Sequence, residues 1–379
     1  MIRPRVFLPG SKIGVMGGGQ LGRMFAIAAR KMGYRVHTFS PEEDTPTGQL
    51  ADVEISAPFE DYAAVEGFAR NVDVITFEFE NIPIESVEVA GKYCEVRPAG
   101  RILHLAQNRT REKEFLQTNG LPIPQFAHVH DAASLAAAVT KIGTPCVLKT
   151  ASFGYDGKGQ QKIASAAEAA SIEVREASVL EKLVDFSKEI SVLVARGIDG
   201  AMETYPVCEN IHRQHILDLT IVPASVSEAV ENSARKLALT VAEHLDLVGL
   251  LAVEMFVLPD DSLLINELAP RPHNSGHFSF DACITSQFEQ QLRAVCGLPL
   301  GSTELLRPVA MANLLGDLWK SGEPDWSAAL RFPDVKLHLY GKTEPREGRK
   351  MGHLVAFGAD TTDAAKRALA AREALSKNA

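Results

Sequence analysis

Two glutamates in consecutive apolar segments are the strongest chemical signal in the sequence: Glu254 in LLAVEMFVL and Glu267 in SLLINEL. The segments read as one β-hairpin, and a two-residue turn at Asp260 and Asp261 would place Glu254 directly opposite Glu267. The same register pairs Leu258 with Leu263 and Phe256 with Ile265. Two carboxylates so close repel each other unless one is protonated or a cation lies between them. A hard divalent ion such as Mg²⁺ suits carboxylate ligands and usually carries substrate phosphates as well. The pair therefore predicts a metal site, and a proton-sharing or locally exposed pair is the alternative.

A glycine-rich stretch, LKTASFGYDGKGQQKI at residues 148–163, is a second candidate. Its Lys149 sits in an apolar strand, where a lysine is costly unless it meets an anion. Two residues separate Gly154 from Gly157, whereas a Walker loop has four, and Gly159 is followed by a strand rather than by a helix. The stretch is therefore predicted to be a strand–loop–strand hairpin whose glycines let the backbone approach phosphates. An ordinary turn is the alternative.

A third candidate, GGGQLG at residues 17–22, follows a strand and opens a helix, as a Gly-x-Gly-x-x-Gly turn does. A dinucleotide, another anion such as a substrate phosphate, or no ligand at all would suit such a turn. The strand VHTFSP ends in Ser40 rather than in the acid that binds a ribose, and Glu42, Glu43 and Asp44 lie beyond it. The turn therefore favours a phosphate-bearing ligand other than a dinucleotide.

The segment LEKLVDFSKE, residues 180–189, lies between the glycine-rich stretch and the acid pair. Backbone groups near Glu181 to Val184 could bond the edge of an adenine ring. Glu189 could bond ribose hydroxyls, with a solvated strand end as its alternative. Together with Lys149 and the acid pair, this segment predicts a site for a nucleotide and its phosphates.

The elements that must position these residues change in kind along the chain. Strand and helix patterns alternate over the first hundred residues, which predicts a parallel, doubly wound sheet with its ligands at the carboxyl ends of the strands. Beyond them come hairpins, a long helix at about 227–245 and a terminal helix over Thr361–Ala374. The predicted domains are residues 1–105, residues 106–297 with a lid at about 120–185, and residues 298–379.

The composition is that of a folded protein in solution, because 46% of the 379 residues are hydrophobic and 23% are charged. The net charge of −9 argues against nucleic acid as the main partner. No apolar run reaches the roughly 18 residues of a membrane span, and the N-terminus lacks the apolar stretch of a signal peptide. The five cysteines are scattered and read as reduced thiols. We therefore expect a cytoplasmic protein without a nucleic-acid or membrane partner.

Five motifs taken together are specific: GGGQLGRM, TFEFENIP, GYDGKGQ, NELAPRPHNSGH and the C-terminal pair HLYGK and RKMGH. Over about residues 13–357 the chain resembles the carboxyaminoimidazole ribonucleotide synthases of the ATP-grasp superfamily. The resemblance implies an α/β fold with a pre-ATP-grasp domain, an ATP-grasp domain with a glycine-rich lid and a small C-terminal domain. It also implies a carbon–nitrogen ligase of purine biosynthesis that acts as a homodimer with Mg²⁺, as two ions.

In the reaction that the resemblance implies, ATP and bicarbonate form carboxyphosphate and ADP leaves. The amine of 5-aminoimidazole ribonucleotide is then carboxylated and phosphate is released. The catalytic residues would be Arg271, His273, Asn274 and Lys158. The metal ligands would be Glu254 and Glu267. The ATP site would comprise Arg109, Lys149, Gly154, Tyr155, Asp156, Gly157, Lys158, Gly159, Gln160, Glu181, Lys182, Leu183, Val184, Glu189, His212, Asn266 and Glu267. The ribonucleotide would contact Gln20, Leu21, Glu78, Glu80, Tyr155, Lys342 and Arg349.

Three other interpretations stay open on the sequence alone. A formate-using glycinamide ribonucleotide transformylase would share ATP and Mg²⁺, although HNSGH and the C-terminal YGK speak against it. An NAD-dependent oxidoreductase built on the first glycine turn would leave the acid pair unexplained. A nucleotide-binding protein without catalysis would leave the combination of Lys149, the lid, Glu254 and Glu267 unexplained. Two positions depart from the family pattern, Phe153 in place of a glycine and Asn81 in place of a histidine, and neither removes a proposed ligand.

Overall fold

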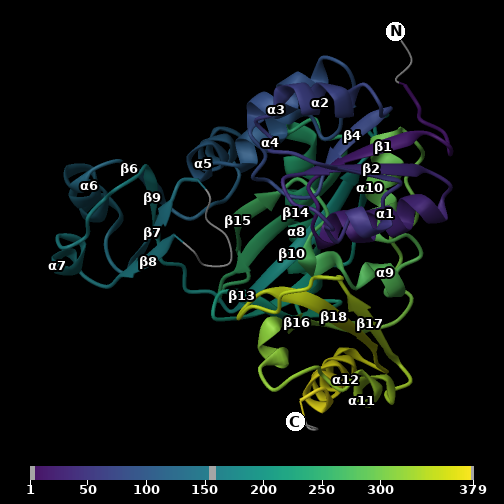
Figure 1. Ribbon diagram of the computed structural model, residues 1–379. Coiled ribbons are helices and arrows are strands. Elements are labelled where there is room, and N and C mark those ends of the chain that lie inside the picture. Colours follow the sequence, from purple (N-terminus) through teal and green to yellow (C-terminus); the bar gives the residue numbers. More distant parts are fainter. Residues whose placement is uncertain (1–4, 153–158, 377–379) are drawn as a thin grey trace.

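The computed structural model describes residues 5–152 and 159–376 and arranges them around three β-sheets (Figure 1). The first sheet has five parallel strands in the order β3-β2-β1-β4-β5. Its strands are β1 (Lys12–Met16), β2 (Arg35–Ser40), β3 (Val53–Ser56), β4 (Val74–Phe77) and β5 (Glu95–Val96). Its helices are α1 (Gln20–Lys31), the short 3-10 helix η1 (Gly48–Leu50), α2 (Tyr62–Ala69), α3 (Ile84–Gly91) and α4 (Gly100–Ala106). The parallel sheet predicted from the alternating pattern is confirmed.

Both faces of this sheet are buried, which is why its strands read as continuous apolar runs. Successive residues of β1 point to opposite faces, so Ile13 and Val15 pack with α1 while Met16 packs with α2 and α3. The carboxyl ends of β1 and β4 lead directly into the glycine turn and into Glu78. The sheet thereby presents two of the predicted motifs at one edge.

The second sheet is a small antiparallel unit that projects from the rest of the molecule, on the left in Figure 1. Helix α5 (Arg109–Thr118) leads into it, and its strand order is β6-β9-β7-β8. Its elements are β6 (Phe126–Val129), α6 (Ala132–Ile142), β7 (Cys146–Thr150), β8 (Gln160–Ile163), α7 (Ala166–Ala169) and β9 (Ser178–Lys182). Strands β7 and β8 flank the glycine-rich stretch and pair antiparallel, with Lys149 opposite Gln160.

The third sheet has nine strands in the order β15-β14-β10-β12-β13-β16-β18-β17, with β11 paired to β10. Its strands are β10 (Lys188–Arg196), β11 (Met202–Thr204), β12 (Cys208–Arg213), β13 (Ile216–Val222), β14 (Gly249–Val257), β15 (Leu263–Ala269), β16 (Val309–Leu315), β17 (Val335–Leu339) and β18 (Lys350–Phe357). Its helices are α8 (Glu228–His244), η2 (Asn274–Gly276), α9 (Ser279–Ala282), α10 (Gln287–Cys296), η3 (Gly316–Trp319), α11 (Trp326–Leu330) and α12 (Thr361–Ala374). Because β13 pairs with β16, this sheet is continuous across residue 298.

The turn of the β14–β15 hairpin is one residue longer than predicted. Neither pair predicted beside the turn forms, because Val257 rather than Leu258 lies opposite Leu263. The Leu258 N–H donates to the Ser262 carbonyl at 2.8 Å, and Asp261 adopts a left-handed φ of 65°. Three-residue hairpin loops of this kind need a left-handed residue, which aspartate tolerates better than most side chains.

A β-bulge restores the predicted alignment of the two glutamates. Met255 pairs with Ile265 while Glu254 pairs with Glu267, so Asn266 is an extra residue in β15. The longer turn and the bulge each shift the register by one residue, in opposite directions. Glu254 and Glu267 therefore lie opposite each other as predicted, although the route to that pairing differs from the predicted one.

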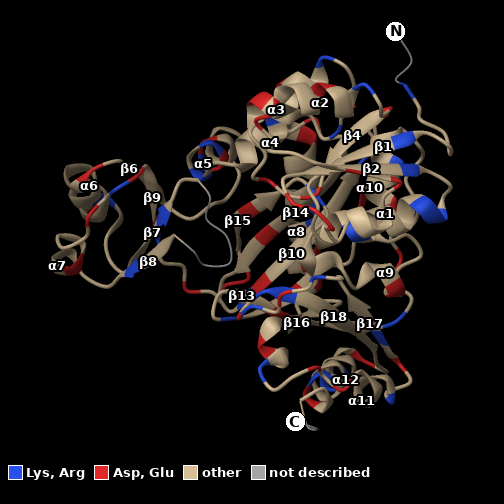
Figure 2. Ribbon diagram, in the orientation of Figure 1, with Lys and Arg blue, Asp and Glu red and all other residues tan. Residues whose placement is uncertain are grey.

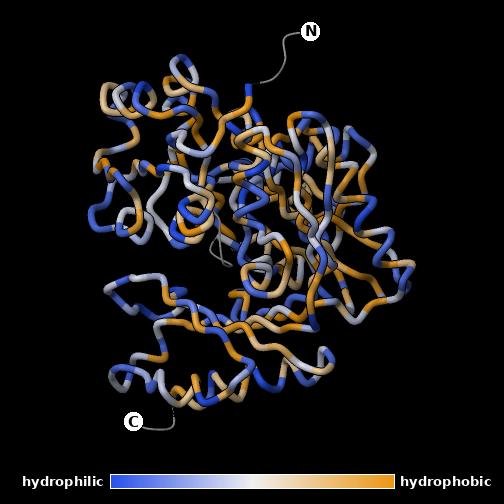
Figure 3. The backbone as a smooth tube through the Cα atoms, turned by 90° about the vertical axis from the view of Figure 1, so that its right-hand side faces the viewer, coloured by the Kyte–Doolittle hydropathy of each residue, from blue (hydrophilic) through white to orange (hydrophobic). Residues whose placement is uncertain are grey.

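Figures 2 and 3 show where charged and hydrophobic residues lie along the chain. Acidic positions interrupt the ribbons of β14 and β15 in Figure 2, and hydrophobic and hydrophilic stretches alternate along the backbone tube in Figure 3. Within residues 5–152 and 159–376, no helix combines the length and the apolar character needed to cross a bilayer. All five cysteines are buried and unpaired, in agreement with their interpretation as reduced thiols.

Candidate active site

A cavity of about 1090 Å³ is lined by residues of the second and third sheets and by residues that follow strands β1 and β4 of the first sheet, and it collects most of the predicted residues. They are Gln20, Leu21, Glu78, Glu80, Arg109, Lys149, Gln160, Glu181, Lys182, Leu183, Val184, Glu189, His212, Glu254, Asn266, Glu267, Arg271, His273 and Asn274. Gly159, Lys342 and Arg349 are not part of this lining. Gly154, Tyr155, Asp156, Gly157 and Lys158 lie outside the described residues.

The carboxylates of the two opposed glutamates each contact a nitrogen-bearing side chain. Glu254 Oε1 lies 3.0 Å from His273 Nε2, and Glu267 Oε2 lies 3.4 Å from an Arg109 guanidinium nitrogen. Burial alone would raise the pKa of Glu254, but the hydrogen bond from His273 and nearby positive charges hold it well below its usual range. The carboxylate of Glu254 is therefore ionised at neutral pH.

The donor set of this pair suits a hard cation. Two carboxylates and the Asn266 amide supply oxygen atoms at one wall of the cavity. Across the described part of the chain, no group of three or more His, Cys, Asp and Glu side chains is placed to hold a metal. A divalent ion at Glu254 and Glu267 would therefore complete its coordination with water and substrate oxygens, as Mg²⁺ commonly does.

Lys149 meets an anion, as its place in an apolar strand predicted, and that anion is a protein carboxylate. Its Nζ lies 3.0 Å from Glu181 Oε2, and the Nζ of Lys113 lies 3.6 Å from the same atom. Burial raises the pKa of Glu181, but Lys113 and Lys149 outweigh it and lower the pKa below its ordinary value. Two lysines thus converge on one glutamate at the wall of the cavity.

Helix α5 holds the backbone on both sides of Glu267. The Lys113 ammonium donates to the Asn266 carbonyl at 2.9 Å, and the Leu268 N–H donates to Glu112 Oε2 at 3.1 Å. Glu112 and Lys113 are both buried, and burial raises the pKa of the carboxyl and lowers that of the ammonium. Neither residue was predicted, because adjacent charges in a polar-faced helix read as solvent-exposed.

The predicted nucleotide segment lines one end of the cavity. Residues 181–184 leave β9 there, and Glu189 on β10 lies 2.8 Å from His212 Nδ1. Burial alone would lower the pKa of His212, but the hydrogen bond and charge of Glu189 raise it. Phe186 and Phe256 stack with their ring centroids 4.7 Å apart and add an apolar wall that suits a flat base.

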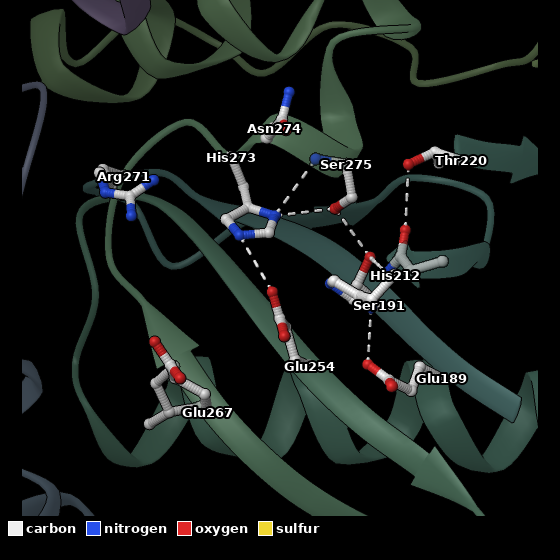
Figure 4. A network of polar contacts seen from close by, with 12 residues as sticks. Glu189, Ser191, His212, Thr220, Glu254, Glu267, Arg271, His273, Asn274 and Ser275 are labelled. Atoms are coloured by element: carbon white, nitrogen blue, oxygen red, sulfur yellow. Dashed lines mark hydrogen bonds and ion pairs between the residues drawn. The ribbon is translucent and has the colours of Figure 1, made fainter. Parts of the chain in front are cut away.

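The segment after β15 carries Arg271, His273 and Asn274, which lie above Glu254 and Glu267 in Figure 4 and line the cavity. Arg271 Nε lies 2.6 Å from Glu80 Oε1, so the arginine is held by the loop that follows β4. The Asn274 amide exchanges two hydrogen bonds with Asn313 of β16, at 3.1 and 2.7 Å. All three side chains are thus held in place by neighbouring elements.

The first glycine turn holds a carboxylate of the protein instead of a phosphate. Gly19 N–H donates to Glu78 Oε1 at 2.7 Å, and Gly22 N–H donates to Glu78 Oε2 at 3.2 Å. The amides at the start of α1 are therefore occupied, which argues against the dinucleotide interpretation and against a substrate phosphate at this turn. Burial raises the pKa of Glu78, although these amides oppose the rise. Gln20 and Leu21 still line the cavity.

Lys342 lies behind the cavity lining. Its Nζ donates to Gln20 Oε1 at 2.7 Å and to the Lys350 carbonyl at 2.8 Å, and both of these partners line the cavity. Burial, followed by the charge of Arg349, lowers the pKa of Lys342 to about 8. Arg349 donates to the Glu344 carbonyl at 2.8 Å. Lys350 was not predicted to be a site residue, although it belongs with Lys342, Arg346 and Arg349 to one basic run of the sequence.

Three domain families match the chain. The ATP-grasp domain matches residues 114–288, the ribonucleotide synthetase preATP-grasp domain matches residues 11–107, and the phosphoribosylaminoimidazole carboxylase C-terminal domain matches residues 309–367. The ATP-grasp match includes the nucleotide segment and the acid pair, and the C-terminal match includes the basic run around Lys342.

Curated relatives match over nearly the whole chain. The N5-carboxyaminoimidazole ribonucleotide synthase of Bacillus subtilis (strain 168) is 46% identical over 353 residues, which cover 92% of each chain. The enzyme of the same name from Brucella melitensis biotype 1 is 41% identical over 91% of this chain and 96% of its own. The bifunctional purine synthesis protein purC/E of Dictyostelium discoideum is 42% identical, but the match spans 37% of that longer protein.

Solved structures agree in fold. An ADP complex of an N5-carboxyaminoimidazole ribonucleotide synthetase superposes with a TM-score of 0.91 at 43% identity and covers 97% of both chains. The Aspergillus clavatus enzyme in complex with ADP and 5-aminoimidazole ribonucleotide superposes with a TM-score of 0.88 at 29% identity and covers 97% of this chain and 99% of its own.

Proposed function

The chain belongs to the N5-carboxyaminoimidazole ribonucleotide synthases of the ATP-grasp superfamily, and from this premise we propose how its residues carry out that activity. It is an ATP-dependent ligase that converts 5-aminoimidazole ribonucleotide to its N5-carboxy derivative in purine biosynthesis. Bicarbonate attacks the γ-phosphoryl group, a P–O bond to ADP breaks, and carboxyphosphate forms. The substrate amine then attacks the carboxyl carbon, loses a proton and displaces phosphate. The formate-using and NAD-dependent alternatives are not supported by the relatives.

The nucleotide half of the cavity would hold ATP through charges and backbone groups. We assign the adenine to the segment Glu181–Val184, the ribose to Glu189 and His212, and the phosphates to Lys149 and Arg109. Lys149 would act as a fixed positive charge, since Glu181 and its neighbours orient it before the nucleotide arrives. Asn266 and Glu267 complete this wall.

Glu254 and Glu267 would hold Mg²⁺, which neutralises phosphoryl oxygens as charge moves toward ADP. The side chains are suited to this role because both are carboxylates, lie opposite each other and face the cavity. When no metal is bound, Arg109 would balance part of the negative charge of the glutamates, and His273 would donate a hydrogen bond to Glu254.

The carboxyl-transfer step would take place beside Arg271, His273 and Asn274. The Arg271 guanidinium offers fixed donors to bicarbonate and carboxyphosphate, and Glu80 holds it in place. His273 and Asn274 supply further hydrogen-bond donors next to it. The roles of Gly154, Tyr155, Asp156, Gly157 and Lys158 as a lid that excludes water stay predictions, as does that of Gly159.

The ribonucleotide would enter between the first sheet and the C-terminal strands. Gln20, Leu21, Glu78 and Glu80 would face its ribose and imidazole, and Lys342 with Arg349 would bind its phosphate. The hydrogen bond between Lys342 and Gln20 supports this placement, because it joins the two predicted parts of the substrate site.

The single observation that carries the proposal is one cavity in which the acid pair, the nucleotide segment and Arg271 to Asn274 converge. We would measure phosphate release from ATP, Mg²⁺ and bicarbonate, with and without 5-aminoimidazole ribonucleotide. Stimulation by the ribonucleotide, with formation of its carboxylated product, is the expected result. An equal rate of phosphate release with and without the ribonucleotide would overturn the substrate assignment. A homodimer and a cytoplasmic location stay predictions, which sedimentation and cell fractionation would test.

A further inference from the structure

A row of polar side chains leads from His273 into the interior of the nine-stranded sheet. Ser191, Asn210, Thr220 and Ser275 are 0%, 6%, 0% and 0% exposed. The register places three of them on one face, because Ser191 lies opposite Glu254 and Asn210 lies opposite Thr220. None of the four was predicted, and none has a part in the reaction as described above.

These side chains form one continuous hydrogen-bond chain (Figure 4). The Thr220 hydroxyl donates to Asn210 Oδ1 at 3.1 Å, and Asn210 Nδ2 donates to Ser191 Oγ at 2.9 Å. The Ser191 hydroxyl donates to Ser275 Oγ at 2.8 Å, and Ser275 Oγ lies 2.8 Å from His273 Nδ1. The links among Thr220, Asn210, Ser191 and Ser275 are buried, and the last link, to His273, is partly buried. Buried polar groups are costly unless all of them are paired.

One backbone group decides the direction of the chain at His273. The Ser275 N–H can only donate, and it faces His273 Nδ1 at 3.3 Å. The Nδ1 atom must therefore accept, so that the Ser275 hydroxyl donates to it as well. The neutral imidazole then carries its proton on Nε2, the atom that lies 3.0 Å from Glu254 Oε1. The opposite direction would set the Nε2 lone pair against a carboxylate.

The backbone of His273 is held independently of its ring. Its N–H donates to Gln287 Oε1 at 2.8 Å, and its carbonyl accepts from Gln287 Nε2 at 2.8 Å. Gln287 is fully buried at the start of α10. With the backbone held in this way, the contacts at Nδ1 set the remaining freedom of the side chain, which is the orientation and tautomer of the ring.

We propose that Ser275, Ser191, Asn210 and Thr220 are positioning residues that fix the tautomer and orientation of His273. They present its Nε2–H to Glu254 and to the region of carboxyl transfer. The inference rests on the proposed function for the role of His273, whereas the hydrogen-bond chain itself can be tested without turnover. The far end of the hydrogen-bond chain, Thr220 on β13, lies three strands away from Glu254 on β14.

The direct test is the protonation pattern of the His273 ring in the wild-type protein. Nitrogen-15 NMR of histidine-labelled protein separates protonated from unprotonated ring nitrogens, and the signals lost in His273→Gln assign them. We expect a protonated Nε2 and an unprotonated Nδ1 near neutral pH. A proton on Nδ1, in place of Nε2, would overturn the proposal whether or not the protein turns over the ribonucleotide.

A matched pair of variants tests the far end of the chain. Thr220→Val keeps the shape of the side chain and removes the donor, whereas Thr220→Ser keeps the donor and removes a methyl group. We expect kcat for carboxylation to fall about fivefold in Thr220→Val, with KM for ATP unchanged, and to stay near wild type in Thr220→Ser. Equal kcat values in the two variants would contradict the proposal.

Ser191→Ala interrupts the chain nearer to the ring and is expected to lower kcat about tenfold. Ser86→Ala is its control, because the buried Ser86 hydroxyl on α3, beside the first sheet, donates to the Phe59 carbonyl at 2.7 Å. If both variants lose stability alike but only Ser191→Ala loses kcat, the chain acts on His273. If their kcat values agree, Ser191 is merely structural and the proposal fails.

Discussion

At the scale of single residues, several carboxylates of the cavity already have a side-chain partner before any ligand binds. Glu254 lies beside His273, Glu267 beside Arg109, and Glu80 beside Arg271. Such pairs fix the side chains in place, so that little reorganisation is needed when phosphate groups and a cation enter.

Glu267→Gln tests the proposed cation site. The change keeps the size of the side chain and removes its charge, so we expect ATP turnover to fall at least about a hundredfold and the Mg²⁺ requirement to rise. Phosphate release measured over a range of Mg²⁺ concentrations checks both. Glu203→Gln, an exposed acid on β11, is the control and should behave like wild type. Turnover within a few-fold of wild type in Glu267→Gln would exclude its role as a metal ligand.

Lys342 predicts a pH dependence of substrate binding. Because its pKa is lowered to about 8, the side chain is charged below that pH and becomes neutral above it. A substrate phosphate favours the charged form, so KM for the ribonucleotide should rise as pH passes 8, while KM for ATP should not. Lys342→Arg, whose guanidinium stays charged, should remove this rise. A KM that is flat from pH 7 to 9 in the wild type would contradict the assignment.

At the scale of elements, two features that the predicted hairpin did not include hold the acid pair in place. The bulge at Asn266 sets the register of β15, and helix α5 holds the backbone on either side of Glu267 through Glu112 and Lys113. Lys113 donates to the Asn266 carbonyl and also lies near Glu181. It therefore links the strand that carries Glu267 to the predicted nucleotide segment. The site therefore depends on a helix that contributes only Arg109 to the cavity lining.

Lys113→Met tests this dependence on α5. The change leaves the buried Glu181 with Lys149 as its remaining lysine partner, and removing one partner of a buried ion pair commonly costs about 3–5 kcal/mol. We expect the free energy of unfolding in urea to fall by about that amount, together with weaker ADP binding by calorimetry. Lys366→Met, at an exposed position of α12, should change stability by no more than about 0.5 kcal/mol. A similarly small effect in Lys113→Met would contradict the role of Lys113 in holding the acid pair in place.

At the scale of the whole molecule, three parts of the chain meet at one cavity and are tied together around it. The nine-stranded sheet continues from β13 into β16, and the paired amides of Asn274 and Asn313 join the carboxyl-transfer segment to that continuation. The bond between Lys342 and Gln20 joins the C-terminal strands to the first sheet. The C-terminal part is therefore an integral part of the site.

Truncation after Gly297 tests whether the C-terminal part can be removed. Loss of β16 would expose the edge of β13 and its apolar side chains, including Leu217 and Leu219 from the two cores. We expect the shortened chain to aggregate and to lose its cooperative unfolding transition, because an unpaired apolar edge promotes association. Light scattering and circular dichroism would show this. A monodisperse chain with a sharp transition and ADP binding would show that residues 298–379 form a separable domain.

The sequence by itself determined the fold class, the family and most of the cavity lining, because those signals are local. Periodicity reveals parallel strands, and motifs such as RPHNSGH carry their side chains in consecutive positions. The tertiary structure alone decided which charges meet. In it, Glu78 accepts hydrogen bonds from the glycine turn, Glu80 pairs with Arg271, and Glu181 pairs with Lys149. It also decided the buried roles of Lys113, Ser191 and Thr220, because long-range pairing and register place them, and residue spacing along one chain does not contain that information.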